Sequence, residues 1–333
     1  MQPMSQPLSV PSVETPFAAV HAWLAGTGFP AREILSLTGD VSPRRYARVV
    51  LEDGATAVLA TYPDEVRDVC PRFLRTGELL TGVGVRVPRI YAASCEHGWM
   101  LLEDFGPQTL GEQRDRPWSE LRLYFRRALE LAGRIAGLPV DEVAGLNPAL
   151  DRDLLRQELA QTWDLFLEPR ELTGGAALTA ALGAALDTLC DRLGAETPVP
   201  CHRDFMVRNL MPLDATGEVA VLDHQDLRLG PPEYDLASLL NDTLFPPADL
   251  EEELLAAVPA ANREGYHRAA AQRTLKAVGT YTKFSLRGAH RHLPLIPPTL
   301  ERCVQHLARV PEGAPLVEDL RRVWVPVLEP AQT

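Results

Sequence analysis

The change of hydrophobic pattern near residue 105 most constrains what this 333-residue chain can fold into. Before it, short apolar segments alternate with turn residues, and Asp53-Gly54 between two of them is a strong β-hairpin signal. After residue 107 the apolar side chains recur at three-to-four spacing, which is typical of helices with one buried face. The pattern predicts an α+β protein with a small β-rich N-terminal lobe and a larger, mostly helical C-terminal lobe.

The segment Glu103-Asp104-Phe105-Gly106-Pro107 interrupts both patterns and marks the boundary between the lobes. We therefore expect an N-lobe over residues 17–105 and a C-lobe over 106–333, after a flexible tail over 1–16 that is rich in Pro, Ser and Gln. Strands are expected over residues 34–37, 46–51, 56–60, 87–91, 99–102, 198–201 and 219–222. Helices are expected over residues 66–80, 122–136, 154–167, 176–193 and 268–286, with a last helix from about Thr299 after a proline-rich loop.

The charge balance argues against several classes of function. The 33 basic and 45 acidic residues give a net charge of −12, whereas binding to nucleic acid or to an acidic membrane surface needs a positive face. No apolar run is long enough to span a membrane, and residues 1–16 do not form a secretory signal, so we expect a cytoplasmic protein. Lysine occurs only as Lys276 and Lys283, which leaves the first two hundred residues without any lysine.

The most specific chemical pattern is the segment His202-Arg203-Asp204-Phe205-Met206-Val207-Arg208-Asn209. Its HxDxxxxN spacing is that of the catalytic loops of kinases. Phosphoryl transfer needs a carboxylate that orients the attacking hydroxyl and accepts its proton, and Asp204 is suited to this. The reaction also needs oxygen ligands for Mg²⁺ on the nucleotide phosphates, which Asn209 can supply. His202 is expected to brace the loop.

Two further clusters follow this loop. The apolar segment Val219-Ala220-Val221-Leu222 ends in Asp223, as expected for a strand that presents a second magnesium ligand. The segment Gly230-Pro231-Pro232-Glu233-Tyr234-Asp235 forms a turn into a helix start. Asp235 is placed to cap that helix or to hold the catalytic loop by accepting hydrogen bonds from backbone N–H groups.

The strings HRDFMVRNL, AVLDHQD and LGPPEYDLASLL, in this order, resemble the aminoglycoside phosphotransferase/choline kinase-like family. The chain is most similar to its cell-wall-recycling branch, the anomeric kinases of N-acetylmuramate and N-acetylglucosamine. The strings GDVSPRRYARV, LLEDFG and QRTLKAVG support that branch, and the resemblance extends from about residue 17 to the last helix. It implies a bilobal protein-kinase-like fold.

The resemblance also implies a reaction and its residues. The reaction is ATP- and Mg²⁺-dependent phosphorylation of the anomeric hydroxyl to a sugar 1-phosphate in peptidoglycan recycling. Asp204 would be the catalytic base, Asn209 and Asp223 the magnesium ligands, and His202 and Asp235 supports of the catalytic loop. The implied ATP-binding residues are Ser42, Arg44, Arg45, Glu103, Asp104 and Phe105.

The chain departs from related kinases at one point. They usually carry a lysine on the third N-lobe strand, where it grips the nucleotide phosphates, but residues 56–61 contain none. Arg44 or Arg45 could take its place, since a guanidinium binds phosphate through two hydrogen bonds. A nucleotide-binding pseudokinase with a regulatory role is therefore one alternative function.

The acceptor is expected to lie near Gln225 and Asp226, which follow Asp223, and near Arg273 and Lys276, which share one face of a helix. These four are candidate substrate-binding residues, although a loop-bracing role for Asp226 and a salt-bridge role for Arg273 and Lys276 compete. The expected partner is a small-molecule sugar, and the expected state is a monomer or homodimer. A phosphotransferase of the aminoglycoside or choline type is the second alternative.

Overall fold

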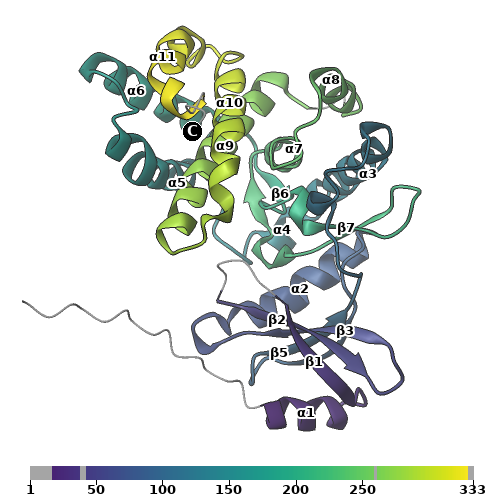
Figure 1. Ribbon diagram of the computed structural model, residues 1–333. Helices are drawn as coiled ribbons and strands as arrows, with labels where there is room; N and C mark the ends of the chain where they lie inside the picture. The colour runs from purple at the N-terminus through teal and green to yellow at the C-terminus, as the bar shows by residue number, and fades with distance from the viewer. Residues whose placement is uncertain (1–16, 38–42, 259–260, 329–333) are drawn as a thin grey trace, which may run out of the picture. The chain divides into compact units, whose positions relative to one another are not determined.

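The computed structural model describes residues 17–37, 43–258 and 261–328 (Figure 1). The chain forms two compact units. Of the described residues, the smaller unit contains those up to Arg67 and the segment Arg89–Asp104, and the larger unit contains Asp68–Pro88 and those from Phe105 onward. Helix α2 (Val69–Gly82), which separates β3 from β4 in the sequence, therefore belongs to the larger unit.

The smaller unit is a five-stranded antiparallel sheet in the order β1-β2-β3-β5-β4. Its strands are β1 (Ala31–Leu37), β2 (Arg45–Leu51), β3 (Thr56–Thr61), β4 (Ile90–Ser94) and β5 (Trp99–Glu103). The predicted Asp53-Gly54 turn joins β2 to β3, and Gly54 has φ +88°, which glycine adopts without a steric penalty. Helix α1 (Phe17–Gly26) buries Val20 and Leu24 against this sheet.

The fourth strand begins later than the sequence predicts. We expect a strand over residues 87–91, but β4 begins at Ile90, whose first partner is Leu102 of β5. The apolar run before it contains Pro88, which has no N–H to give to a ladder. The expectation is wrong by three residues for this reason.

The larger unit consists mainly of helices around one continuous hydrophobic core. Besides α2, its helices are α3 (Trp118–Ala136), α4 (Val140–Val143), α5 (Arg152–Thr162), α6 (Ala176–Gly194), α7 (Tyr234–Leu240), α8 (Ala248–Ala256), α9 (Arg263–Leu286), α10 (Ile296–Leu307) and α11 (Val317–Leu328). Helix α9 is buried along most of its length because it packs against α5, α7 and α10 (Figure 1). Across the described residues, no helix has the length and apolarity needed to cross a membrane.

Several helix boundaries differ from the sequence prediction; α2 begins at Val69, α3 at Trp118 and α9 at Arg263, where starts at 66, 122 and 268 are expected. Two further differences have a visible cause. The helix expected over residues 154–167 ends as α5 at Thr162 and continues as a π-helical turn, Trp163–Leu167. The last helix is expected from about Thr299, but α10 begins at Ile296 and α11 follows it. Pro297 and Pro298 suggest a loop, yet they occupy the first turn of α10, where the N–H that proline lacks has no helical acceptor.

Two short ladders in the larger unit position the polar loops. Strand β6 (Val199–Cys201) pairs with β9 (Arg228–Gly230), and β7 (Leu210–Pro212) pairs with β8 (Val219–Val221). The loop His202–Asn209 follows β6, and the segment that begins with Asp223 follows β8. The Leu222 N–H donates to the Asn209 C=O at 2.8 Å, so the two polar segments lie next to each other.

Candidate active site

The loop after β6 is held in place by the Asp235 carboxylate at the start of α7. Its Oδ2 accepts a hydrogen bond from the His202 N–H at 2.6 Å, and its Oδ1 accepts one from the Arg203 N–H at 2.9 Å. Burial raises the pKa of Asp235 to about 6, against the effect of these donors. A single side chain therefore fixes the backbone on the N-terminal side of Asp204.

The His202 side chain is fully buried and joins the two polar segments. Its Nε2 lies 2.9 Å from the Leu222 carbonyl oxygen, at the end of β8, and its ring meets Phe205 edge to face. Because the Leu222 carbonyl is an acceptor, His202 Nε2 is the protonated nitrogen. This arrangement matches a bracing position rather than one that faces a substrate.

Strained backbone marks the same two segments. Of the three non-glycine residues with positive φ in the described chain, two lie here: Arg203 at +73° and Asp223 at +56°. Left-handed backbone at such residues costs about 1–3 kcal/mol and persists only where surrounding contacts enforce it. Strain of this kind concentrates at functional sites, and here it lies directly before Asp204 and at Asp223.

Asp204 contacts a group of buried cations. Arg273 Nη2 donates to its Oδ1 at 3.2 Å, and Arg203 Nη1 lies 4.0 Å from its Oδ2. Burial by itself would raise the pKa of this carboxyl, but the charges of Lys276, Arg273 and Arg203 together hold the pKa of Asp204 well below its usual range. Asp204 is therefore ionised at neutral pH and able to accept a hydrogen bond from a hydroxyl.

Asn209 and Asp223 offer oxygen ligands at neighbouring positions. Asn209 Nδ2 donates to the Asp204 carbonyl at 2.9 Å, which turns its Oδ1 the other way. No group of three or more His, Cys, Asp and Glu side chains that could hold a metal occurs in the part of the chain that the structure describes. One carboxylate and one amide oxygen fit Mg²⁺, which usually completes its shell with phosphate oxygens and water.

Gln225 and Asp226 make contacts within the protein. Gln225 is buried, and its Nε2 donates to Asp223 Oδ1 at 3.1 Å. Asp226 Oδ2 accepts from Arg203 Nη1 at 3.4 Å, and its Oδ1 accepts from Arg228 Nη2 at 3.5 Å. These contacts orient Asp223 and the loop that contains Asp204. A substrate contact for either side chain stays a prediction.

Sequence reasoning missed Glu158 on α5, which joins several charged residues of the site. Its Oε1 accepts from Arg203 Nη2 at 2.8 Å and from Lys276 Nζ at 2.9 Å. Burial raises its pKa, but the charges of Lys276 and Arg203 outweigh burial, so the pKa of Glu158 is lowered. A signal exists in the sequence, because Glu158 interrupts an apolar helical face between Leu155 and Leu159, which are both buried.

Of the described residues with an expected nucleotide role, all except Phe105 belong to the smaller unit. Ser42 lies outside the described residues. Arg44 precedes β2 and Arg45 begins it, while Arg48 of β2 pairs with Asp104, with Nε 2.6 Å from Oδ2. The Asp104 side chain therefore binds its own sheet.

The neighbours of Asp104 are also engaged. The Glu103 N–H donates to the Arg89 carbonyl at 2.8 Å, and Glu103 Oε2 accepts from the Arg89 N–H at 3.1 Å. In the larger unit, the Arg86 guanidinium lies 5.0 Å from the centre of the Phe105 ring. The nucleotide roles of Arg44, Arg45, Glu103, Asp104 and Phe105 stay predictions.

A family profile described as "Phosphotransferase enzyme family" matches residues 33–272, which is most of the chain and includes both polar segments. The chain belongs to the phosphotransferase enzyme family. The predicted resemblance is thereby confirmed.

Curated relatives of this phosphotransferase align over nearly its whole length. It is 34% identical over 309 residues to an N-acetylmuramate/N-acetylglucosamine kinase of Pseudomonas aeruginosa, across 87% of this chain and 88% of that protein. It is 31% identical over 323 residues to the protein of the same name from Neisseria meningitidis serogroup B, across 88% and 92% of the two chains. The predicted enzyme class, a small-molecule kinase, is confirmed.

Solved structures confirm the fold of the phosphotransferase. Choline kinase LicA from Streptococcus pneumoniae superposes with a TM-score of 0.61 at 14% identity, across 88% of this chain and 99% of that chain. A GDP complex of aminoglycoside 2'-phosphotransferase-IIIa superposes with a TM-score of 0.63 at 15% identity, across 88% and 98%. At these identities the likeness concerns the fold alone, and it confirms the predicted α+β kinase-like fold.

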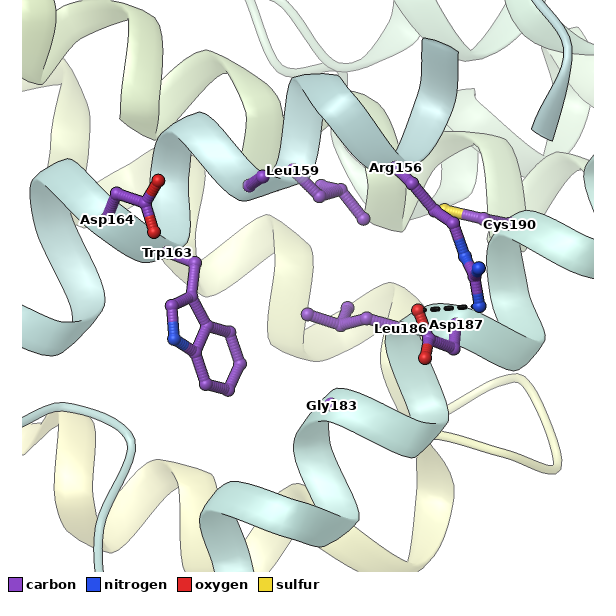
Figure 2. Close-up of a pocket in the computed structure, with 9 residues that line it drawn as sticks. Arg156, Leu159, Trp163, Asp164, Gly183, Leu186, Asp187 and Cys190 are labelled. Carbon is purple, nitrogen blue, oxygen red and sulfur yellow. Dashed lines mark ion pairs between the residues drawn. The ribbon is translucent and has the colours of Figure 1, made fainter. Parts of the chain in front are cut away.

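The phosphotransferase also has a cavity of about 300 Å³ between α5 and α6 (Figure 2). Arg156 and Asp187 form an ion pair of 2.8 Å at one side of it, and the Trp163 ring projects into its other side. Its lining residues are Arg156, Leu159, Ala160, Trp163, Asp164, Gly183, Leu186, Asp187 and Cys190. None of the predicted site residues is among them.

Proposed function

We propose that this phosphotransferase uses ATP and Mg²⁺ to phosphorylate the anomeric hydroxyl of N-acetylmuramate, N-acetylglucosamine or both. The product is a sugar 1-phosphate, as peptidoglycan recycling requires. One observation carries the proposal: relatives aligned over nearly the whole of both chains share the name N-acetylmuramate/N-acetylglucosamine kinase.

Asp223 and Asn209 are the residues that would hold Mg²⁺ in this reaction. When bound, the ion neutralises charge on the nucleotide phosphates and orients them. The chain's own contribution is to hold the two oxygen ligands in register, through the Leu222 to Asn209 hydrogen bond and the Gln225 contact to Asp223. The residues present are therefore compatible with the ion.

Asp204 would orient the acceptor hydroxyl and take its proton. The cations around Asp204 lower its pKa, which makes it a weak base. A weak base suits an acidic acceptor, and a hemiacetal hydroxyl is more acidic than an ordinary alcohol because the ring oxygen stabilises the oxyanion. The lowered pKa of Asp204 is therefore compatible with an anomeric acceptor.

The alternative acceptors are not separated by local charge, because Arg203 and Lys276 are paired with Glu158 and Arg273 is paired with Asp204. The name shared by the aligned relatives favours the N-acetyl sugars over aminoglycosides and choline. The pseudokinase alternative is opposed by the presence of Asp204, Asn209 and Asp223 in one ordered arrangement.

A coupled ADP-release assay tests the proposal. The acceptor panel contains N-acetylmuramate, N-acetylglucosamine, glucose, choline and kanamycin, and phosphorus-31 NMR identifies the product of any turnover. We expect sugar 1-phosphate from the N-acetyl sugars only. Turnover with kanamycin or choline alone would overturn the acceptor, and Mg·ATP binding without any turnover would favour the pseudokinase.

The Asp204→Asn variant tests the base. It keeps the size of the side chain but removes the proton acceptor, so turnover should fall at least about 100-fold, while Mg·ATP binding persists. The matched control is Asp187→Asn, an aspartate of the same unit that pairs with Arg156 on α5. Equal turnover of Asp204→Asn and wild type would refute the assignment of the base.

A further inference from the structure

Helix α9 brings two buried cations to the catalytic loop. Arg273 and Lys276 lie three residues apart, on one helical face, and only 7% and 9% of their surfaces are exposed. Long cationic side chains rarely enter a protein interior unless ionic or hydrogen-bonding partners compensate for the lost hydration. Their burial beside Asp204 therefore needs an explanation.

Arg273 is oriented by three contacts. Its Nε donates to Ser238 Oγ at 3.2 Å, its Nη2 donates to Asp204 Oδ1 at 3.2 Å, and Nη2 also lies 3.6 Å from Met206 Sδ. These bonds use Nε and Nη2, whereas a guanidinium carries five N–H donors in a planar fork. The fork is held rigidly at the carboxylate and keeps donor capacity for a further anion.

Lys276 is held from the opposite element, α5. Its Nζ lies 2.9 Å from Glu158 Oε1, and an ammonium has three donors. The same Glu158 oxygen accepts from Arg203 Nη2 at 2.8 Å, and Arg203 Nη1 lies 4.0 Å from Asp204 Oδ2. Two cations from one helix thus belong to the buried ionic network of Asp204, where the attacking hydroxyl would bind.

We propose that Arg273 and Lys276 are catalytic residues that bind the phosphoryl group during its transfer, an inference that rests on the kinase function proposed above. In that step the acceptor oxygen forms a new bond to the γ-phosphorus. The bond from that phosphorus to the bridging oxygen breaks, its electron pair leaves with ADP, and the acceptor proton passes to Asp204. Arg273 and Lys276 donate hydrogen bonds to the equatorial oxygens, on which negative charge is spread.

The position of these cations favours this role over two others. A purely structural ion pair would not need a second cation at a carboxylate that Arg203 already approaches. A site for a carboxylate elsewhere on the acceptor would lie away from Asp204, because the sugar ring separates such a group from the attacking hydroxyl. Arg273 instead touches the Asp204 carboxylate itself, and fixed charges in a buried site act strongly on a developing anion.

The first readout is binding of a mimic of the transferring group and does not depend on turnover. The probe is Mg·ADP with aluminium fluoride and N-acetylglucosamine, followed by fluorine-19 NMR and calorimetry. In Lys276→Met and Arg273→Lys we expect binding of the fluoride complex to weaken about 100-fold or more, while binding of Mg·ADP alone is unchanged. Lys283→Met is the matched control, because Lys283 also lies on α9 and also contacts α5, through Gln161 at 3.0 Å.

The second readout compares the effects of the substitutions on kcat and on KM. We expect kcat to fall about 100-fold or more with both N-acetylmuramate and N-acetylglucosamine, and KM for each sugar to change little. Thermal unfolding of each variant verifies that it folds, and Arg273→Met replaces Arg273→Lys if the latter does not.

The outcomes separate this inference from the proposed function. Undiminished binding of the fluoride complex by the folded variants would overturn it, as would a loss confined to N-acetylmuramate, which would assign the cations to the acceptor's carboxylate. If the wild type formed the fluoride complex with kanamycin or choline but not with the N-acetyl sugars, only the proposed acceptor would be refuted. Fluoride-complex binding by the Lys276 and Arg273 variants, measured with that acceptor, would still test the inference. A wild type that does not bind Mg·ADP refutes the proposed function and the inference together.

Discussion

The Glu158 carboxylate pairs with cations from two elements, the loop after β6 and helix α9. It accepts hydrogen bonds from Arg203 and Lys276, and Gln272 Nε2 lies 3.3 Å from its Oε2. Removing one charge from a buried ionic group leaves its partners uncompensated, and such changes are among the costly ones. In the proposed mechanism, Glu158 would act on the reaction through Arg203 and Lys276, which it holds in place.

The Glu158→Gln variant tests this at the residue scale. The pKa of Lys276 is lowered to about 8 by burial and by the nearby Arg273, while Glu158 partly restores it. Without the carboxylate, the pKa of Lys276 should fall below about 8 and kcat should fall with it. Because the chain has only two lysines, NMR of carbon-13 methylated lysines resolves Lys276 from Lys283, the internal control. A Lys276 pKa that does not move would contradict this account.

At the scale of elements, α5 and α9 approach each other closely at Gly279. A Cβ atom there would lie 2.3 Å from Thr162 Oγ1 and 2.8 Å from Thr162 Cα. The Thr162 hydroxyl donates to the Leu275 carbonyl at 2.8 Å, so it is not free to move aside. The small residue lets the two helices that carry Glu158 and Lys276 pack at this distance.

Gly279→Ala should therefore reduce the free energy of unfolding by about 1–3 kcal/mol. Gly183→Ala is the matched control, since Gly183 also lies inside a helix but a Cβ there has no neighbour within 4 Å. The control should be stabilised by about 0.5–1 kcal/mol, because alanine favours the helix. Urea unfolding measures both, and equal effects in the two variants would refute the close-packing argument.

A histidine pair joins α9 to α10. His267 Nδ1 lies 2.9 Å from His306 Nδ1, and His306 Nε2 lies 2.7 Å from Asn241 Oδ1. The amide oxygen must accept from Nε2, so His306 Nδ1 is the unprotonated nitrogen and accepts from His267. The pair therefore needs a neutral His306 ring, because protonation of His306 Nδ1 would remove the acceptor.

Acid should weaken this helix contact. Burial lowers the pKa of His306 well below its usual value of 6.5 and lowers that of His267 as well, so the unfolded chain binds protons more readily. Stability from the pair is fully present above pH 6.5 and is lost as the pH falls below it. Urea unfolding at pH 7.5 and 5.0 should show a smaller loss for His306→Gln than for wild type. The exposed His290 supplies the control, and a loss that is the same in His290→Gln and His306→Gln would contradict the prediction.

At the scale of the whole molecule, ligand binding should raise the melting temperature. A ligand at about 100 times its Kd stabilises the folded state by about 2.7 kcal/mol, which corresponds to several degrees for a chain of this size. We expect ADP to raise Tm in the presence of Mg²⁺ and much less with EDTA. Asp223→Asn should abolish the magnesium-dependent part, and Asp187→Asn should keep it. If ADP raised the wild-type Tm equally with Mg²⁺ and with EDTA, this result would argue against the proposed magnesium ligands.

The elements that the sequence predicted well are those whose signals are local. The Asp53-Gly54 turn sets one hairpin, and apolar periodicity marks α6 and most of α3 and α9. Two of the errors occur at prolines, because a proline can either exclude a residue from a strand or occupy the first turn of a helix. Pro88 delays β4 by removing a donor, whereas Pro297 and Pro298 begin α10, and the sequence pattern by itself does not tell these positions apart.

The candidate site also combines contacts that local sequence spacing predicts with contacts that it does not. The spacing within one loop places Asp204 and Asn209 together, and the strand before Asp223 brings it to the same end of the ladder. The contacts of Arg273 with Asp204 and of Lys276 with Glu158 join residues 69 and 118 positions apart. No local pattern encodes such pairs, because helix packing determines them.

The sequence by itself determined the kinase-like class and predicted the candidate catalytic loop and the pair of magnesium-ligand candidates, since each depends on residues close together in the chain. Only the tertiary structure decided what surrounds Asp204: Arg273 and Lys276 from α9 and, through Lys276 and Arg203, Glu158 from α5. The physical reason is that the electrostatic field at a side chain depends on distance in space and on burial, and both arise only when distant helices pack together.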